Sequence, residues 1–291
     1  MIDARNHYEL MYRNSGGLTA RARLVAFVNT HAAPLLSGKY SDGTGRQLHR
    51  AVGGLLALAG ICSYDSERHG EAQRYFRHAL WFAESSGDHG FGGYVHALMA
   101  NQALALGDYR RAVDFTEAAL RFVGKGVSPA LMADLNVMQA KAYALMGDSP
   151  SAYSAMTEAE SSASRIRRSE EPPETSYIQP GLVETQLAEA LIDLGDLEPA
   201  RRYAQESLRI DAHPRGRVNR LASMVSLELR DGNIDHASTL AIDMVNRAQG
   251  MESCRLRDRF RRIRIVLNRT PIGIAAEAVE TIDRTLRLSP W

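Results

Sequence analysis

A short polar motif recurs between apolar stretches and divides much of the chain into similar segments. Four times an apolar run ends in glycine followed by aspartate or asparagine, and an alanine stands five residues after the glycine. These glycines are Gly107, Gly147, Gly195 and Gly232, and a related stretch around Ala72 has lost the glycine. Glycine favours the left-handed conformation that ends a helix, and aspartate caps the start of the next helix. The pattern therefore predicts pairs of helices joined by tight turns.

Small residues at fixed offsets predict that the two helices of each pair pack closely. The alanines that follow the motif are Ala72, Ala112, Ala152, Ala200 and Ala237. Successive alanines are separated by 40, 40, 48 and 37 positions. Twelve positions earlier, on the first helix of each pair, stand Gly60, Ala100, Ala140, Ala188 and Val225. Side chains this small let two helix backbones approach each other. We expect close contact in the first four pairs and a wider fifth pair, because valine is larger.

The spacing also predicts how the chain is organised. We expect N-terminal capping helices in residues 1–47, a repeat array in residues 48–250, and Arg-rich and capping helices in residues 251–291. The longest spacing is explained by a polar stretch with three prolines, residues 167–181, which predicts a loop between the third and fourth pairs. No strand pattern competes with the helical one.

These offsets resemble the tetratricopeptide repeat (TPR), a unit of two helices with small residues where they meet. The resemblance covers roughly residues 48–250, although the spacing exceeds the usual repeat of about 34 residues. It implies an all-α fold, a right-handed superhelix of about five TPR-like helix pairs with N- and C-terminal capping helices. Each pair in such a stack contacts only its neighbours, so the ends need caps.

A narrower resemblance concerns the particular amino-acid sequence of the repeats. The runs Leu58–Gly60, His69–Phe76 and Tyr94–Ala103 are similar to the sensor domain of actinobacterial (Streptomyces-type) XRE-family helix-turn-helix transcriptional regulators. In that family a small DNA-binding domain precedes the repeats, and we find no such segment in residues 1–45. Whether it was removed or is naturally absent is left open. The resemblance implies transcription regulation in bacterial secondary metabolism or development.

Composition and charge narrow the class of protein. Hydrophobic residues make up 45% of the 291 and charged residues 24%, which is typical of a globular chain. The net charge of +1 argues against a protein whose whole surface is basic and binds nucleic acid. Cys62 and Cys254 lie too far apart in sequence to suggest a disulfide framework. With no apolar run long enough to cross a bilayer, we expect a cytoplasmic protein without membrane contact.

Catalytic and metal-binding motifs were sought without success. The nine histidines form no HExxH motif and no cluster with cysteine, and no phosphate loop or nucleophile elbow is present. We therefore expect that the chain is not an enzyme and uses no cofactor or metal.

The first helix of each pair in a stacked array lines its inner surface, which makes these helices the candidate binding site. Polar and aromatic residues expected on this ligand groove are Tyr64, Tyr94, Asn101, Lys141, Glu189 and Asn219. Asparagine can bond both donor and acceptor of a peptide backbone, and lysine can hold a carboxylate. The groove then suits a peptide or a small acidic signal. The alternative is that Lys141 and Glu189 pair with each other or are simply solvated.

An arginine cluster near the C-terminus is the second candidate. The candidates for contact with nucleic acid or with an acidic partner are Arg257, Arg261, Arg262 and Arg264. The alternative is a solvated helix flank paired with Asp258 and neighbouring acids. Phosphate contacts alone position a protein without reading sequence, so we expect no specific DNA binding by this chain alone.

The function predicted from these features is that of a regulatory sensor and interaction domain. It would bind a peptide or small signal in its groove and modulate a transcriptional regulator or another partner. The alternative is a TPR adaptor for protein–protein interaction that has no small-molecule ligand. We also expect a homodimer formed through a terminal helix. Ligand, partner and promoter are left open.

Overall fold

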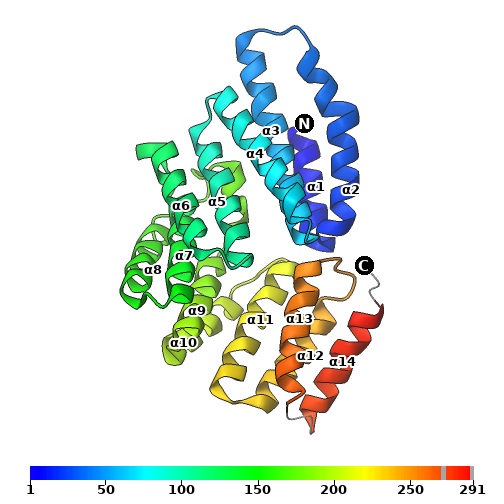
Figure 1. Cartoon of the computed structure of the whole chain (residues 1–291), viewed down its shortest axis with the longest axis vertical. Coiled ribbons are helices and arrows are strands. Elements are labelled where there is room, and N and C mark those ends of the chain that lie inside the picture. Colours follow the sequence, from blue (N-terminus) through cyan, green and yellow to red (C-terminus); the bar gives the residue numbers. More distant parts are fainter. Residues whose placement is uncertain (270–272, 289–291) are drawn as a thin grey trace. The chain divides into compact units, whose positions relative to one another are not determined.

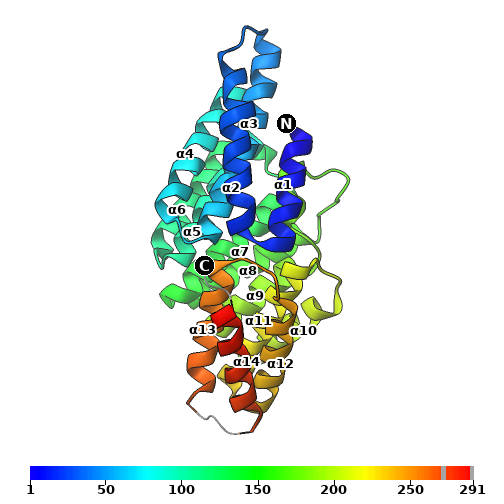
Figure 2. The ribbon, with the colours of Figure 1, turned by 90° about the vertical axis from the view of Figure 1, so that its right-hand side faces the viewer.

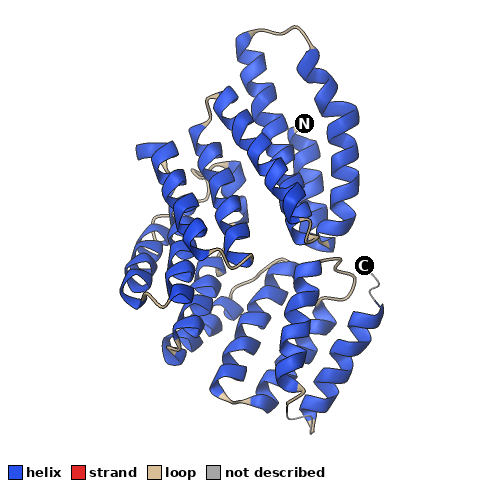
Figure 3. Cartoon of the chain, viewed as in Figure 1, coloured by secondary structure: helices blue, strands red, loops and turns tan. Residues whose placement is uncertain are grey.

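The computed structural model describes residues 1–269 and 273–288, and within them every regular element is a helix (Figure 3). The all-α prediction is confirmed. The chain divides into two compact units. Unit 1 comprises Met1–Tyr12 and Gly16–Ile178, and unit 2 comprises Arg13–Ser15 and Gln179–Trp291. The division falls within the loop predicted at residues 167–181.

Unit 1 is built from helices that pack as consecutive pairs (Figure 1). Its α-helices are α1 (Ile2–Ser15), α2 (Gly17–Phe27), α3 (Asp42–Asp65), α4 (His69–Ser86), α5 (His89–Ala105), α6 (Tyr109–Val123), α7 (Pro129–Met146) and α8 (Ser149–Ala163). The pairs are α3 with α4, α5 with α6, and α7 with α8, and α2 packs on α3. Short π and 3₁₀ turns extend α2 to Ser37.

Unit 2 continues the same arrangement. Its helices are α9 (Leu182–Leu194), α10 (Leu197–Arg209), α11 (Pro214–Asp231), α12 (Ile234–Arg247), α13 (Cys254–Leu267) and α14 (Ile274–Leu288). Helix α9 pairs with α10, α11 with α12, and α13 with α14, which also packs on α12. In the described part of the chain, no helix is both long and apolar enough to cross a membrane.

The turns between paired helices follow the predicted chemistry. Gly107 and Gly147 have φ of 78°, the left-handed region in which a residue with a Cβ is strained. The carboxylates of Asp108 and Asp148 each accept a hydrogen bond at 3.2 Å from a backbone N–H three residues on, in the first turn of the next helix. The same kind of turn, a left-handed glycine followed by a capping aspartate, joins α4 to α5, where the repeat motif had not predicted a turn.

The small residues lie where the paired helices meet. All five alanines that follow the turns are fully buried, and so are their counterparts twelve positions earlier. At Gly60 an added Cβ would lie 2.4 Å from a ring carbon of Phe76. The small residue on the first helix of this pair therefore makes room for the ring of Phe76 on the second helix.

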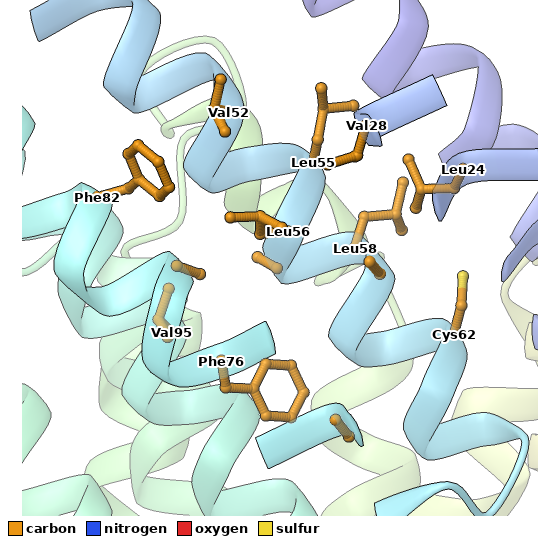
Figure 4. Close-up of a cluster of buried hydrophobic side chains, with 14 of the residues drawn as sticks. Leu24, Val28, Val52, Leu55, Leu56, Leu58, Cys62, Phe76, Phe82 and Val95 are labelled. Carbon is orange, nitrogen blue, oxygen red and sulfur yellow. The ribbon is translucent and has the colours of Figure 1, made fainter. Parts of the chain in front are cut away.

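The core of unit 1 includes its N-terminal helices. Figure 4 shows Leu24 and Val28 meeting Leu55 and Leu58 of α3, while Phe76 of α4 lies on the other side of that helix. Asp65, at the end of α3, accepts a hydrogen bond at 2.8 Å from the backbone N–H of Gly17. The N-terminal region is thus packed into the same core as the first helix pair.

One helix end in unit 2 is completed by a side chain from the next helix. Helix α10 ends without a glycine, and its C-cap, Ile210, is extended. Arg220 of α11 is buried, and its Nη1 donates hydrogen bonds to the carbonyls of Ser207 at 2.6 Å and Ile210 at 2.5 Å. Its Nη2 donates to the carbonyl of Pro180. A single arginine therefore supplies the donors that the end of α10 lacks.

Candidate ligand-binding surface

Four of the six predicted groove residues lie on the first helices of the pairs in unit 1. Together with Asp134 they define what we call the inner surface, carried by α3, α5 and α7: Tyr64, Tyr94, Asn101, Asp134 and Lys141. The hydroxyl of Tyr64 donates to the backbone carbonyl and to Oδ1 of Asn101, both at 3.3 Å. The structure therefore joins two of the predicted residues across neighbouring repeats.

The chain itself occupies part of this surface. The segment Glu171–Ile178, here called the docked segment, follows α8 and contacts α5 through the 3₁₀ turn Pro173–Tyr177. Figure 2 shows the green irregular stretch of chain that contains it. Glu174 is only 5% exposed and Ile178 2%. The ring of Tyr177 lies 5.8 Å from that of Tyr94, between centroids, and its hydroxyl donates to Asp134. A loop with this little exposure is bound rather than solvated.

Arg50 of α3 holds the acidic residue of the docked segment. Its Nη2 donates to Oε2 of Glu174 at 2.6 Å, and its Nε donates to Oδ2 of Asp88 at 2.6 Å. The guanidinium carbon lies 3.9 Å from the centroid of the Phe91 ring. Asp88 is itself fixed as the N-cap of α5. Since Arg50 is positioned by a helix cap and an aromatic face, it forms a prearranged carboxylate site.

Asp134 supplies the second polar contact. It is 4% exposed, and burial raises its pKa to about 6, although the hydrogen bond from Tyr177 and the charge of Lys141 lower it in part. Burial and the nearby carboxylate of Asp134 raise the pKa of Tyr177 well above its ordinary value. At neutral pH the phenol is therefore a donor and the carboxylate its acceptor.

Helix α1 covers another part of the inner surface. The side chain of Arg5 hydrogen-bonds the hydroxyl of Tyr94 and forms an ion pair with Glu9 at 3.2 Å. Burial raises the pKa of Tyr94, which keeps its hydroxyl protonated. The predicted groove residue Tyr94 is thus engaged by two segments of unit 1.

The remaining groove predictions fall in unit 2. Glu189 accepts a hydrogen bond from Oγ of Ser223 at 2.9 Å and pairs with Arg259 of α13 at 3.3 Å. Asn219 is partly exposed on α11. These two residues belong to a different compact unit from Tyr64 and Tyr94, so the binding surface is described for unit 1 alone.

The arginine cluster lies on α13, and most of its members are engaged within unit 2. Arg261 pairs with Asp258 at 2.6 Å, and Arg264 pairs with Asp283, its Nη2 donating at 2.9 Å. Arg257 donates from Nη2 to the carbonyl of Leu286 at 3.3 Å. Arg262 is exposed. The pairing with Asp258 and other acids was the alternative to nucleic-acid contact in the sequence analysis.

Sequence reasoning missed three residues of this site. Arg50 precedes the first recognised repeat motif, and Glu174 and Tyr177 lie in the predicted loop. The sequence does hold a weak signal, because a loop with Pro172 and Pro173 is stiffened in an extended conformation before the acidic and aromatic residues. Nothing in the pattern shows the surface on which that loop docks.

No protein-family model matches the sequence, and no curated protein is detectably similar to it. Within residues 1–269 and 273–288, no three His, Cys, Asp or Glu side chains are grouped closely enough to hold a metal ion.

Proposed function

We propose that the helix pairs of both units are TPR-like repeats, about five in number, of a right-handed superhelical array. The support is the burial of a small residue on the first helix of the first four pairs, together with an alanine on each second helix, in the spacing described above. Capped turns with left-handed glycine recur at the same place in successive pairs. Repeats of this kind present their first helices as a binding surface.

We further propose that the chain is a regulatory sensor and interaction domain. It binds a peptide or small signal on the inner surface of unit 1 and thereby modulates a transcriptional regulator or another partner. One observation carries this proposal: an irregular stretch of polypeptide is held on that surface by side chains of α3, α5 and α7. The transcriptional role rests on the resemblance of the sequence to the XRE-family sensors.

The chemistry of the surface suits an acidic, aromatic ligand. Arg50 offers a charged, oriented donor, Nη2, for a carboxylate, and Asp134 accepts from a hydroxyl. Tyr94 adds an aromatic contact between them. Charge-assisted bonds fix the register of a ligand, whereas the aromatic face contributes apolar contact area.

The test compares ligand-induced thermal stabilisation of the whole chain with that of two arginine variants. Fractions of low molecular mass, synthetic acidic peptides and protein fractions are added to the native chain, to Arg50→Ala and to Arg110→Ala. Arg110 is 80% exposed on α6 and serves as the matched control. A ligand present at 100 times its Kd should stabilise the native chain by about 2.7 kcal/mol.

We expect the response to survive in Arg110→Ala and to be lost in Arg50→Ala. Stabilisation by protein fractions alone would favour the adaptor alternative. An equal response of Arg50→Ala to every ligand would contradict binding at the inner surface.

A further inference from the structure

We propose that the docked segment is a displaceable internal occupant of the inner surface, and that it imitates the ligand. The external ligand is then an internal stretch of a partner protein with the same chemistry: a carboxylate, a tyrosine three positions later, and an aliphatic residue directly after it. This inference rests on the proposed function and specifies both the partner chemistry and the regulation of that surface.

The spacing of the recognised groups follows from the local backbone. Residues Pro173–Tyr177 form a 3₁₀ turn, in which side chains at positions i and i+3 lie on the same side. Glu174 and Tyr177 therefore reach the inner surface together, one toward Arg50 and the other toward Asp134. Ile178 follows as a buried apolar contact. Pro173 is exposed, and a ligand needs no particular side chain at its position.

The means of attachment explain why the docked segment can leave. It is held by one short turn and a few side chains rather than by a helix pair with a continuous apolar seam. A buried ion pair such as Arg50–Glu174 gains little net free energy, because removing both charges from water offsets their attraction. Such a contact contributes more to the specificity of binding than to the free energy of binding. A competing chain that repeats the contacts can therefore replace the segment.

The tether makes the segment a competitor for any external ligand. A segment joined to its site by a short flexible connection has an effective concentration of about millimolar. The apparent affinity for an external chain falls in proportion to the fraction of molecules with an unoccupied surface. Regulation follows, because any event that weakens the docked segment raises the affinity for the partner.

The path of the chain indicates an internal stretch of a partner rather than a free terminus. The docked segment enters the surface from α8 and continues into Gln179 and Pro180. Its contacts come from side chains, those of Glu174, Tyr177 and Ile178 together with Glu171, which accepts a hydrogen bond at 3.1 Å from the backbone N–H of Ala130. Its backbone continues at both ends. A site of this kind holds no chain end, so blocked peptide ends should not affect binding.

The experiment measures binding of a labelled peptide to the whole chain by fluorescence anisotropy. The peptide spans residues 168–180 and is prepared with free and with blocked ends. The protein is used in its native form and as Glu174→Ala/Tyr177→Ala, which removes the contacts with Arg50 and Asp134 and leaves the hydrogen bond of Glu171 to α7. We expect the double variant to bind the peptide at least about tenfold more tightly than the native chain.

Matched controls separate release of the segment from a general effect of mutation. Arg167→Ala/Glu170→Ala changes an exposed ion pair nearby and should bind as weakly as the native chain. A peptide with Glu174→Gln and Tyr177→Phe should bind the opened variant at least about tenfold less tightly, because it loses the charge-assisted bond and the hydroxyl donor. If the double variant does not fold, as judged by circular dichroism, a chain with residues 171–178 replaced by eight Gly and Ser residues takes its place.

Three results would overturn the inference. They are equal binding by the native and opened chains, no binding by a folded opened chain, and equal binding of the two peptides. A marked preference for the peptide with free ends would overturn the assignment to an internal stretch. The proposed function would survive these results if another ligand stabilises the chain in an Arg50-dependent manner, so the two failures are distinguishable.

Discussion

Replacing Asp134 by asparagine should stabilise unit 1 at neutral pH. The change keeps the shape of the side chain and an oxygen that accepts from Tyr177, but it removes a charge that is almost fully buried. Burial raises the pKa of Asp134 from 3.8 to about 6. Each pH unit of this difference corresponds to about 1.4 kcal/mol, so the ionised carboxylate costs the folded state about 3 kcal/mol.

The sign of the pH dependence follows from proton binding. Between the unfolded pKa and the folded one, the folded state holds more protons, so the native chain loses stability as the pH rises. The loss begins near pH 3.8 and is complete above about pH 6. The stability of Asp134→Asn relative to the native chain should therefore increase by about 2 kcal/mol between about pH 4.5 and about pH 7.5.

Urea unfolding followed by tryptophan fluorescence provides the measurement. The sequence holds two tryptophans, of which Trp291 lies outside the described residues and Trp81 lies on α4 of unit 1. A Trp291→Phe background therefore confines the signal to unit 1. Asp114→Asn is the matched control, because Asp114 is 62% exposed on α6. A difference that does not change with pH, or a native chain that is favoured at neutral pH, would refute the reasoning about Asp134.

Three further predictions concern packing, charge and DNA. Gly60→Ala should lower the urea midpoint of unit 1, because its Cβ would overlap Phe76, whereas Gly70→Ala has open space and should leave the midpoint unchanged or raise it. Glu228→Ala should destabilise unit 2 by about 1–3 kcal/mol, because Arg201 and Asn233 lose a buried acceptor while Arg201 keeps its pair with Asp231. The pKa of Glu228 is lowered, even though its burial alone would raise it, because Arg201 and Asn233 hydrogen-bond the carboxylate. Its stabilisation should therefore persist above about pH 4.5 and vanish as the pH falls through the lowered pKa, as urea midpoints at several pH values would show. In a mobility-shift assay the chain alone should give at most a salt-sensitive, non-selective complex, and a tight, selective complex at physiological salt would contradict this.

The repeating part of the fold was predictable because its signals are local. A glycine that must be left-handed and an aspartate that caps the next helix act within one turn of chain, as at Gly147 and Asp148. Small residues at fixed offsets then report which faces of the two helices meet.

The site was predictable only in part because its contacts are distant in sequence. Position within a repeat placed Tyr64 and Asn101 on the same surface. In the structure these two residues contact each other across neighbouring pairs. The pair Arg50–Glu174 joins residues 124 positions apart, and no periodicity links them. Whether a polar loop remains in solvent or docks depends on shape and charge at its destination, which the sequence of the loop does not contain.

The buried guanidinium of Arg220 has a consequence for the order in which unit 2 is assembled. Helices α7, α9 and α11 each end at a left-handed glycine, so each carries its own stop signal. At the end of α10 the donors come instead from Nη1 of Arg220 on α11, while Nη2 of the same guanidinium donates to the carbonyl of Pro180 just ahead of α9. The end of α10 therefore gains these donors only when α11 is docked, so we expect α9, α10 and α11 to depend on one another for stability.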